Sequence, residues 1–132
     1  MLEVTLYQVL GGEEGLKKLV DAFYQVMSDA PEAKGILKMH PDLPRANQKL
    51  FEFLSGWLGG PDLFVQKYGH PRLRARHLPF AIGISERDQW LFCMKRALEI
   101  CNTSPEFNSM FMSAIARLAD HMRNQSEGPH GS

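Results

Sequence analysis

The chain has 132 residues, of which 44% are hydrophobic and 23% are charged, and its 15 basic and 15 acidic residues cancel to a formal net charge of zero. The balanced charge argues against a nucleic-acid-binding protein, which carries a basic footprint. No apolar run approaches the roughly 20 residues of a membrane span, and the N-terminus lacks the pattern of a signal peptide. We therefore expect a cytoplasmic protein with one domain at 1–124 and a disordered tail at 125–132.

Four segments, at 13–28, 45–58, 86–101 and 105–123, show the periodicity of amphipathic helices, and a short helix is expected near 5–9. Ser85 and Ser104 are the predicted N-caps of the last two helices. No segment has the sustained alternation of a β-strand, so the predicted fold class is all-α. The apolar stripe of the first helix consists of Leu16, Leu19, Val20, Phe23 and Met27.

The two cysteines, Cys93 and Cys101, fall within the third predicted helix. Eight residues of helix separate their Cα atoms by about 12 Å. A disulfide needs a Cα separation below about 7 Å. We therefore interpret both as unpaired, small hydrophobic residues.

The segment from Gly59 to Ser85 is rich in proline and glycine, and it begins with a Gly59–Gly60–Pro61 stop signal. Only one short helix is expected there, at about 71–78. A stretch of about 25 residues that is mostly loop is uncommon inside a compact domain and is often functional. We expect this segment to pack against a bound ligand.

This segment contains a histidine among arginines, in the run from Tyr68 to Phe80 that reads YGHPRLRARHLPF. A neutral imidazole on a short helix is a good metal or haem ligand. Arginines beside it can pair with carboxylates, such as haem propionates. From this chemistry alone, a surface position is the more frequent situation for a histidine next to arginine, so the residues by themselves favour a surface role for His77 over ligation.

Further motifs occur in a specific order around this run. They are Gly11–Gly12, Phe23–Tyr24, Phe53–Leu54 before Gly59–Gly60–Pro61, Gly69–His70–Pro71, Leu73–Arg74–Ala75–Arg76–His77, and Trp90. Their order and spacing resemble the second group of the truncated haemoglobins, from Leu6 to about Asn124. The resemblance implies a two-over-two helical sandwich that encloses one non-covalent haem b with its iron.

The same resemblance implies roles for individual residues. His77 matches the proximal ligand of the iron, Tyr24 and Trp90 match distal residues that hydrogen-bond the ligand, and Arg76 matches a propionate contact. For Tyr24 and Trp90, a purely structural role in the core is the alternative. Arg74, Lys49 and Tyr68 are further candidates for the propionate edge. Other positions that match the haem lining are Phe23, Leu50, Phe53, Leu54, Phe80 and Met94.

Two distal positions depart from the commonest family pattern. His40 stands where an aromatic residue often covers the haem, and Leu50 stands where some members carry glutamine; the usual gate position is Ala46. His40 is interpreted as a polar group that bonds Tyr24 or the ligand. A solvent-facing histidine, or direct binding of His40 or Tyr24 at the sixth iron position, are the alternatives.

The predicted function is binding of dioxygen and other diatomic ligands at a pentacoordinate-type iron, with slow oxygen release because of Tyr24 and Trp90. Slow release suits nitric-oxide or reactive-species detoxification, or peroxidase-like chemistry, with a separate electron donor. A non-enzymatic oxygen carrier or store is the alternative, and a haem-free helical interaction module is a third. The expected partners are dioxygen, nitric oxide or peroxide, without nucleic acid or membrane, and the chain is expected to be a monomer or weak dimer.

Overall fold

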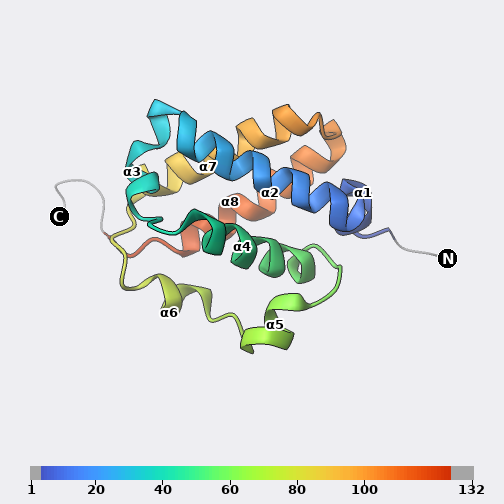
Figure 1. Ribbon diagram of the computed structural model, residues 1–132, viewed down its shortest axis with the longest axis horizontal. Helices are drawn as coiled ribbons and strands as arrows, with labels where there is room; N and C mark the ends of the chain where they lie inside the picture. Colours follow the sequence, from blue (N-terminus) through green and yellow to red (C-terminus); the bar gives the residue numbers. More distant parts are fainter. Residues whose placement is uncertain (1–3, 126–132) are drawn as a thin grey trace.

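A computed structural model describes residues 4–125. Within this range the chain is helical and contains no strand, which confirms the all-α prediction (Figure 1). None of the described helices is both long and apolar enough to cross a bilayer. Of the predicted disordered tail, only Gln125 is described, and 126–132 lie outside the described residues. The elements are α1 (Leu6–Leu10), α2 (Gly12–Asp29), the 3-10 turn η1 (Pro31–Ala33), α3 (Lys34–Lys38), α4 (Leu43–Trp57), α5 (Leu63–Tyr68), α6 (Leu73–His77), α7 (Ile84–Cys101) and α8 (Pro105–His121).

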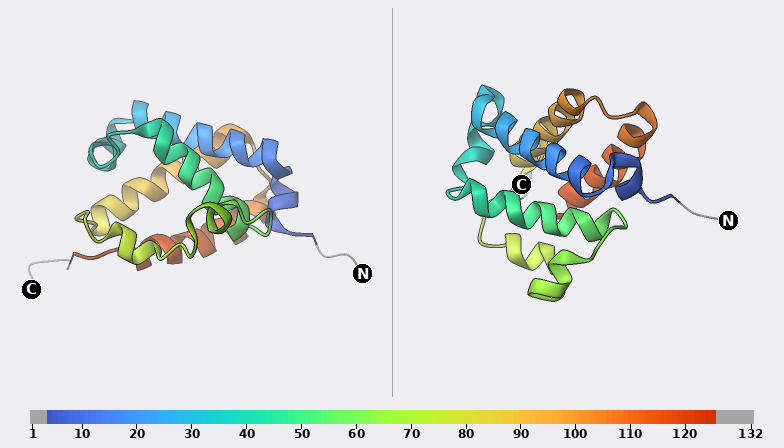
Figure 2. Two further views of the ribbon diagram at one scale, coloured as in Figure 1. Left: turned by 60° about the horizontal axis from the view of Figure 1, so that its bottom comes forward. Right: turned by 45° about the vertical axis from the view of Figure 1, so that its right-hand side comes forward.

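The four long helices form two layers, in which α2 and α4 lie over α7 and α8 (Figure 2). Helix α2 contacts both α4 and α7, and α7 packs on α8. The short helix α5 packs on α4, and α6 follows it on the way to α7 (Figure 1). This arrangement is the two-over-two sandwich that the resemblance implied.

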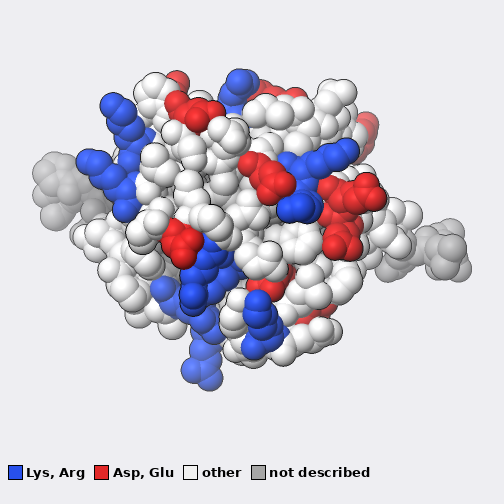
Figure 3. All heavy atoms as spheres, viewed as in Figure 1, with Lys and Arg blue, Asp and Glu red and all other residues white. Residues whose placement is uncertain are grey.

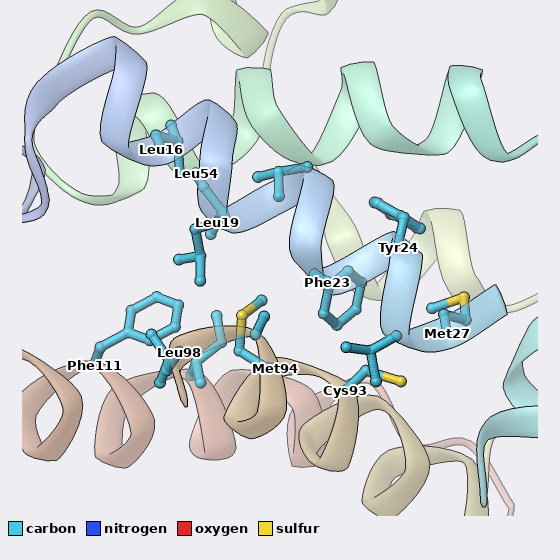
Figure 4. Close-up of a cluster of buried hydrophobic side chains, with 14 of the residues drawn as sticks. Leu16, Leu19, Phe23, Tyr24, Met27, Leu54, Cys93, Met94, Leu98 and Phe111 are labelled. Atoms are coloured by element: carbon cyan, nitrogen blue, oxygen red, sulfur yellow. The ribbon is translucent and has the colours of Figure 1, made fainter. Parts of the chain in front are cut away.

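The centre of the sandwich is the apolar stripe of α2. Its five predicted residues are all fully buried. They face Met94 and Leu98 of α7 and Phe111 of α8, and Phe23 points from α2 toward α7 (Figure 4). Full burial of such a side chain contributes about 1.5–3 kcal/mol. This core holds α2 and α7 rigidly, and both helices supply side chains to the cavity described below.

The helix starts show which caps the sequence predicted correctly. Ser104 caps α8, since its Oγ accepts a hydrogen bond from the backbone N–H of Phe107 at 3.1 Å. The prediction of Ser85 as the cap of α7 is wrong. Helix α7 begins after Gly83, whose N–H donates to the Glu86 carboxylate at 2.7 Å. Glutamate three residues after the cap closes this turn as in a capping box, so Ser85 lies inside the helix.

The proline- and glycine-rich segment contains two short helices rather than the single one predicted. Helix α6 corresponds to the predicted helix, and α5 precedes it. In α5 the rings of Phe64 and Tyr68, one turn apart, lie 4.6 Å from each other, and Phe64 is buried with its ring 6.2 Å from that of Phe53. Tertiary packing therefore stabilises a helix that is too short to show a periodic pattern.

Both cysteines lie on α7 as free thiols, as predicted. Cys93 is fully buried in the core, whereas Cys101 is partly exposed near the end of the helix.

Candidate functional site

A cavity of about 620 Å³ lies between the two layers, and helices α2 to α8 all supply residues to its wall. This volume falls within the range of about 300–1,000 Å³ that is typical of ligand and cofactor sites. Most of the exposed surface of the wall is apolar, although charged side chains also line the cavity. Four uncharged side chains in the wall can form hydrogen bonds: Tyr24, His40, His77 and Trp90.

His77, the last residue of α6, has a defined tautomer. Its Nδ1 lies 2.6 Å from the carbonyl oxygen of Leu73, one turn earlier. Because a carbonyl oxygen only accepts, Nδ1 must carry the proton and Nε2 keeps its lone pair. A backbone carbonyl bound to one ring nitrogen is the usual way in which a metal-binding histidine is oriented. His77 is therefore prepared to bind an iron in the cavity.

Tyr24 of α2 lies in the opposite layer from α7 and is 8% exposed. Its hydroxyl donates to the carbonyl oxygen of Ala46 on α4 at 3.2 Å. Burial raises the pKa of Tyr24 well above its usual range, so the phenol keeps its proton. Tyr24 is therefore a permanent hydrogen-bond donor in the cavity wall.

Trp90 of α7 is the second donor. Its ring lies 4.9 Å from that of Phe23, and Phe23 in turn packs edge-on against Tyr24 at 4.8 Å. Within residues 4–125, no hydrogen bond is found for the indole N–H of Trp90. Since that N–H only donates, it is available to an acceptor in the cavity. Phe23 thus holds both donors in place from behind.

His40 follows α3 and also lines the cavity. Its Nδ1 lies 2.8 Å from the carbonyl oxygen of Ile36, so Nδ1 carries the proton and Nε2 is an acceptor. The ring centroid is 6.0 Å from that of Tyr24. Burial is the main cause that lowers the pKa of His40; the hydrogen bond to Ile36 acts in the opposite direction, and the proximity of the His77 ring lowers the pKa further. His40 is half-buried in the cavity wall. This position fits a polar group beside Tyr24 better than it fits a solvent-facing histidine.

Basic side chains form one edge of the cavity. Arg45, Lys49 and Arg76 are among its lining residues, and Lys and Arg gather on the surface where α4 lies above α6 (Figure 3). The Arg76 guanidinium lies 5.3 Å from the centroid of the Phe64 ring, and its Nε donates to the carbonyl of Pro71 at 2.6 Å. This edge suits the carboxylate groups of a ligand.

The cavity brings together most of the predicted site residues, which are Tyr24, His40, Leu50, Phe53, Leu54, Arg76, His77, Phe80 and Trp90. Four others lie elsewhere. Phe23 and Met94 are fully buried in the core behind the wall, where the α2 and α7 stripes interlock. Tyr68 is not a lining residue, and its ring packs against that of Phe64. Arg74 donates to carbonyl oxygens at the end of α8 instead of reaching the cavity.

Sequence reasoning missed the floor of the cavity. Ile115 and Leu118 of α8 and Met122 just after this helix line it, as do Ile36 and Met39 around α3. The first three of these residues lie on the apolar face of the last predicted helix. A helix face that lines a cavity has the same apolar pattern as a face that packs against the core, so the pattern alone does not distinguish the two. Helix α3 was not predicted because five residues carry no periodicity.

The described residues fit a haem. An apolar slot receives the ring system, the free Nε2 of His77 can coordinate the iron, and Arg45, Lys49 and Arg76 stand at one edge for the propionates. Among the described residues, none of those that line the cavity is a cysteine that could attach a haem covalently.

Comparison with known proteins agrees with this fit. The family model of the bacterial-like globins matches residues 5–124. The group 2 truncated hemoglobin YjbI of Bacillus subtilis is 41% identical over 116 residues, which cover 88% of this chain and 86% of that protein.

Two solved structures are also similar. A cold-adapted truncated hemoglobin from the Antarctic bacterium Pseudoalteromonas haloplanktis superposes with a TM-score of 0.90 at 47% identity, covering 93% of this chain and 100% of that one. A truncated oxygen-avid haemoglobin from Bacillus subtilis has a TM-score of 0.83 at 39% identity, covering 92% and 100%.

Proposed function

Because the chain belongs to the bacterial-like globins and, within them, to the group II truncated haemoglobins, we propose that it retains dioxygen at a haem for redox chemistry rather than for transport. Proteins of this family bind haem iron non-covalently, and a haem with one protein ligand supplies an open coordination position of the pentacoordinate type. The observation that carries the proposal is the pair of donors, Tyr24 and Trp90, held against one buried ring, that of Phe23.

His77 of α6 and the basic residues at the cavity edge would hold the cofactor. His77 presents Nε2 because Leu73 holds its other nitrogen. Arg76, Lys49 and Arg45 would pair with the two propionates, which adds charge-assisted hydrogen bonds. The apolar wall, which includes Leu50, excludes water. Exclusion of water would strengthen the polar contacts inside the cavity.

Tyr24 and Trp90 would donate hydrogen bonds to a diatomic ligand, such as dioxygen, that carries partial negative charge. A buried donor that is left without a partner costs about 1–3 kcal/mol. A difference of 1.4 kcal/mol corresponds to a factor of about ten in an equilibrium constant. The Tyr24 hydroxyl has one proton, so donation to a ligand replaces its bond to Ala46. Because Nε2 of His40 can only accept a hydrogen bond, it would compete with the ligand for that single proton. Oxygen-avid binding in a similar structure, from Bacillus subtilis, supports this account.

Slow release favours a reaction over transport. Nitric oxide and dioxygen together with one electron give nitrate, so each turnover requires an electron from a separate donor. The same two donors would polarise a peroxide held in the cavity. Detoxification of nitric oxide or of peroxides is therefore the chemistry that we assign to the site.

Stopped-flow measurement of oxygen release tests this proposal. We expect release to be slow relative to oxygen-carrying globins, and the oxygenated protein to convert added nitric oxide to nitrate in a 1:1 ratio. Rapid release, with an unchanged rate in the Tyr24→Phe and Trp90→Phe variants, would instead identify the chain as a carrier or store.

A further inference from the structure

The side chain of Asn124, just after α8, uses every polar position of its amide. Its Nδ2 donates to the carbonyl oxygens of His77 at 3.2 Å and of Phe80 at 2.7 Å. Its Oδ1 accepts from the backbone N–H of Ile82 at 3.0 Å. Because two partners only accept and the third only donates, the orientation of the amide is fixed by the contacts themselves.

The backbone of Asn124 strengthens the same connection. Its N–H donates to the carbonyl oxygen of Ile82 at 2.9 Å, and the N–H of Gln125 donates to the same oxygen at 3.1 Å. One residue at the end of α8 is therefore joined to three positions along 77–82, the segment that leads from α6 to α7.

Helix α6 has few other restraints. It contains five residues, none of which is buried, and its N-cap residue Arg72 makes no side-chain cap and has a left-handed backbone with φ of 45°. Helices shorter than about 12 residues are marginal on their own. Helix α6 therefore depends on contacts from outside for its position.

We propose that Asn124 is a positioning residue for the proximal histidine. Leu73 sets the rotation of the His77 imidazole, and Asn124 sets where the His77 backbone stands relative to the floor of the cavity. Arg74, which lies on α6 with His77, reinforces this link, since its guanidinium donates to the carbonyl oxygens of His121 and Arg123. The end of α8 thus controls the height and tilt of the imidazole. This inference rests on the proposed function, in which His77 binds the haem iron.

The variant Asn124→Asp tests it. Aspartate keeps the shape and the acceptor for Ile82, but it places a carboxylate oxygen against the carbonyls of His77 and Phe80. The matched control is Asn108→Asp at the other end of α8. Asn108 donates from Nδ2 to the carbonyl of Thr103 at 3.3 Å and accepts from the Thr103 hydroxyl through Oδ1, far along the chain from α6.

Three readouts are measured in the wild type and both variants. They are the iron–histidine stretching band of the ferrous protein, the rate of haem transfer to a scavenging apoglobin, and amide hydrogen exchange. For Asn124→Asp we expect a shifted or broadened band, transfer about tenfold faster, and faster exchange over 73–82. For Asn108→Asp we expect wild-type values for the band and the transfer rate, with faster exchange confined to 102–108. If Asn124→Asp lowers the yield of folded protein, Asn124→Ser provides the same comparison.

Two results would overturn the inference and leave the proposed function intact. One is a wild-type band and transfer rate in Asn124→Asp; the other is an equal change in Asn108→Asp, which would mean that only global stability matters. A wild-type protein that lacks the iron–histidine band altogether would overturn the proposed function and this inference with it. A wild-type band that is unaffected by Asn124→Asp would overturn the inference alone.

Discussion

The hydroxyl of Tyr24 on α2 donates a hydrogen bond to the carbonyl oxygen of Ala46 on α4 over 3.2 Å. This bond joins the two helices of the upper layer at the wall of the cavity. The donor that we assign to ligand stabilisation therefore also has a structural partner when no ligand is present. Its removal affects both ligand release and the free energy of unfolding.

Replacement of Tyr24 by phenylalanine keeps the ring packing on Phe23 and removes only the hydroxyl. We expect oxygen release to become about 10- to 100-fold faster, which corresponds to a loss of about 1–3 kcal/mol, and stability to fall by about 1 kcal/mol. Stopped-flow release and urea unfolding measure the two effects. Tyr7→Phe on α1, outside the cavity wall, is the control. An unchanged release rate would transfer the role to Trp90.

Trp90→Phe removes the second donor while an aromatic ring remains against Phe23. We expect oxygen release about tenfold faster than in the wild type. Trp57→Phe on α4 is the matched control, because Trp57 stacks on Phe53 and does not line the cavity. Equal release rates in the Trp90→Phe variant and the wild type would mean that the indole N–H does not reach the ligand.

The sequence predicts the four long helices and their buried stripes because each stripe repeats over three or more turns. It does not predict α3 or α5, whose five and six residues depend on tertiary contacts such as that between Phe64 and Phe53. The cap of α7 was misassigned because the Glu86 side chain, rather than that of Ser85, completes the first turn.

Within the site, the resemblance predicted most of the side chains that line the cavity, but it did not distinguish them from side chains that are buried in the core behind the wall. Phe23 and Met94 occupy helix faces that differ from those of Tyr24 and Trp90 by less than a third of a turn, which only packing resolves. Arg74 and Arg76 have the same charge and lie two residues apart, yet one binds the end of α8 and the other the cavity edge. The role of Asn124 depends on a contact between segments 42 or more residues apart, which no local pattern encodes.

Glu52 of α4 is 5% exposed, and its Oε2 accepts hydrogen bonds from Gln48 at 3.0 Å and Lys67 at 3.3 Å. Burial opposes its charge, but these hydrogen bonds outweigh burial and hold the pKa of Glu52 below its usual value. A carboxylate with a depressed folded-state pKa stabilises the fold above the unfolded-state pKa, and that contribution is lost as the pH falls through the folded-state value.

Glu52→Gln should therefore destabilise the protein by about 1–3 kcal/mol at pH 7, and the difference from the wild type should shrink as the pH falls below about 4. Urea unfolding at a series of pH values measures it. Glu32→Gln, at an exposed position in η1, should change stability by less than about 0.5 kcal/mol. A difference for Glu52→Gln that stays constant with pH would show that its charge does not contribute.

The two cysteines should react with alkylating reagents at different rates. Burial raises the pKa of Cys93 to about 11, and its thiol is fully buried, whereas Cys101 is partly exposed. Because the thiolate is the reactive form, iodoacetamide at pH 8 should modify Cys101 first and Cys93 only in urea. Mass spectrometry of the digested protein identifies the sites. Prior modification of Cys93 would contradict the packing of α2 on α7.

The central claim is that His77 binds a haem iron through Nε2, and the visible spectrum of freshly purified protein tests it most directly. We expect a Soret band in the wild type and in the control His70→Gly, which alters an exposed histidine of the same segment. His77→Gly should lose stable haem, or retain it with an altered spectrum that added imidazole restores. A wild-type spectrum in His77→Gly, or no Soret band in the wild type after haem is added, would contradict the account.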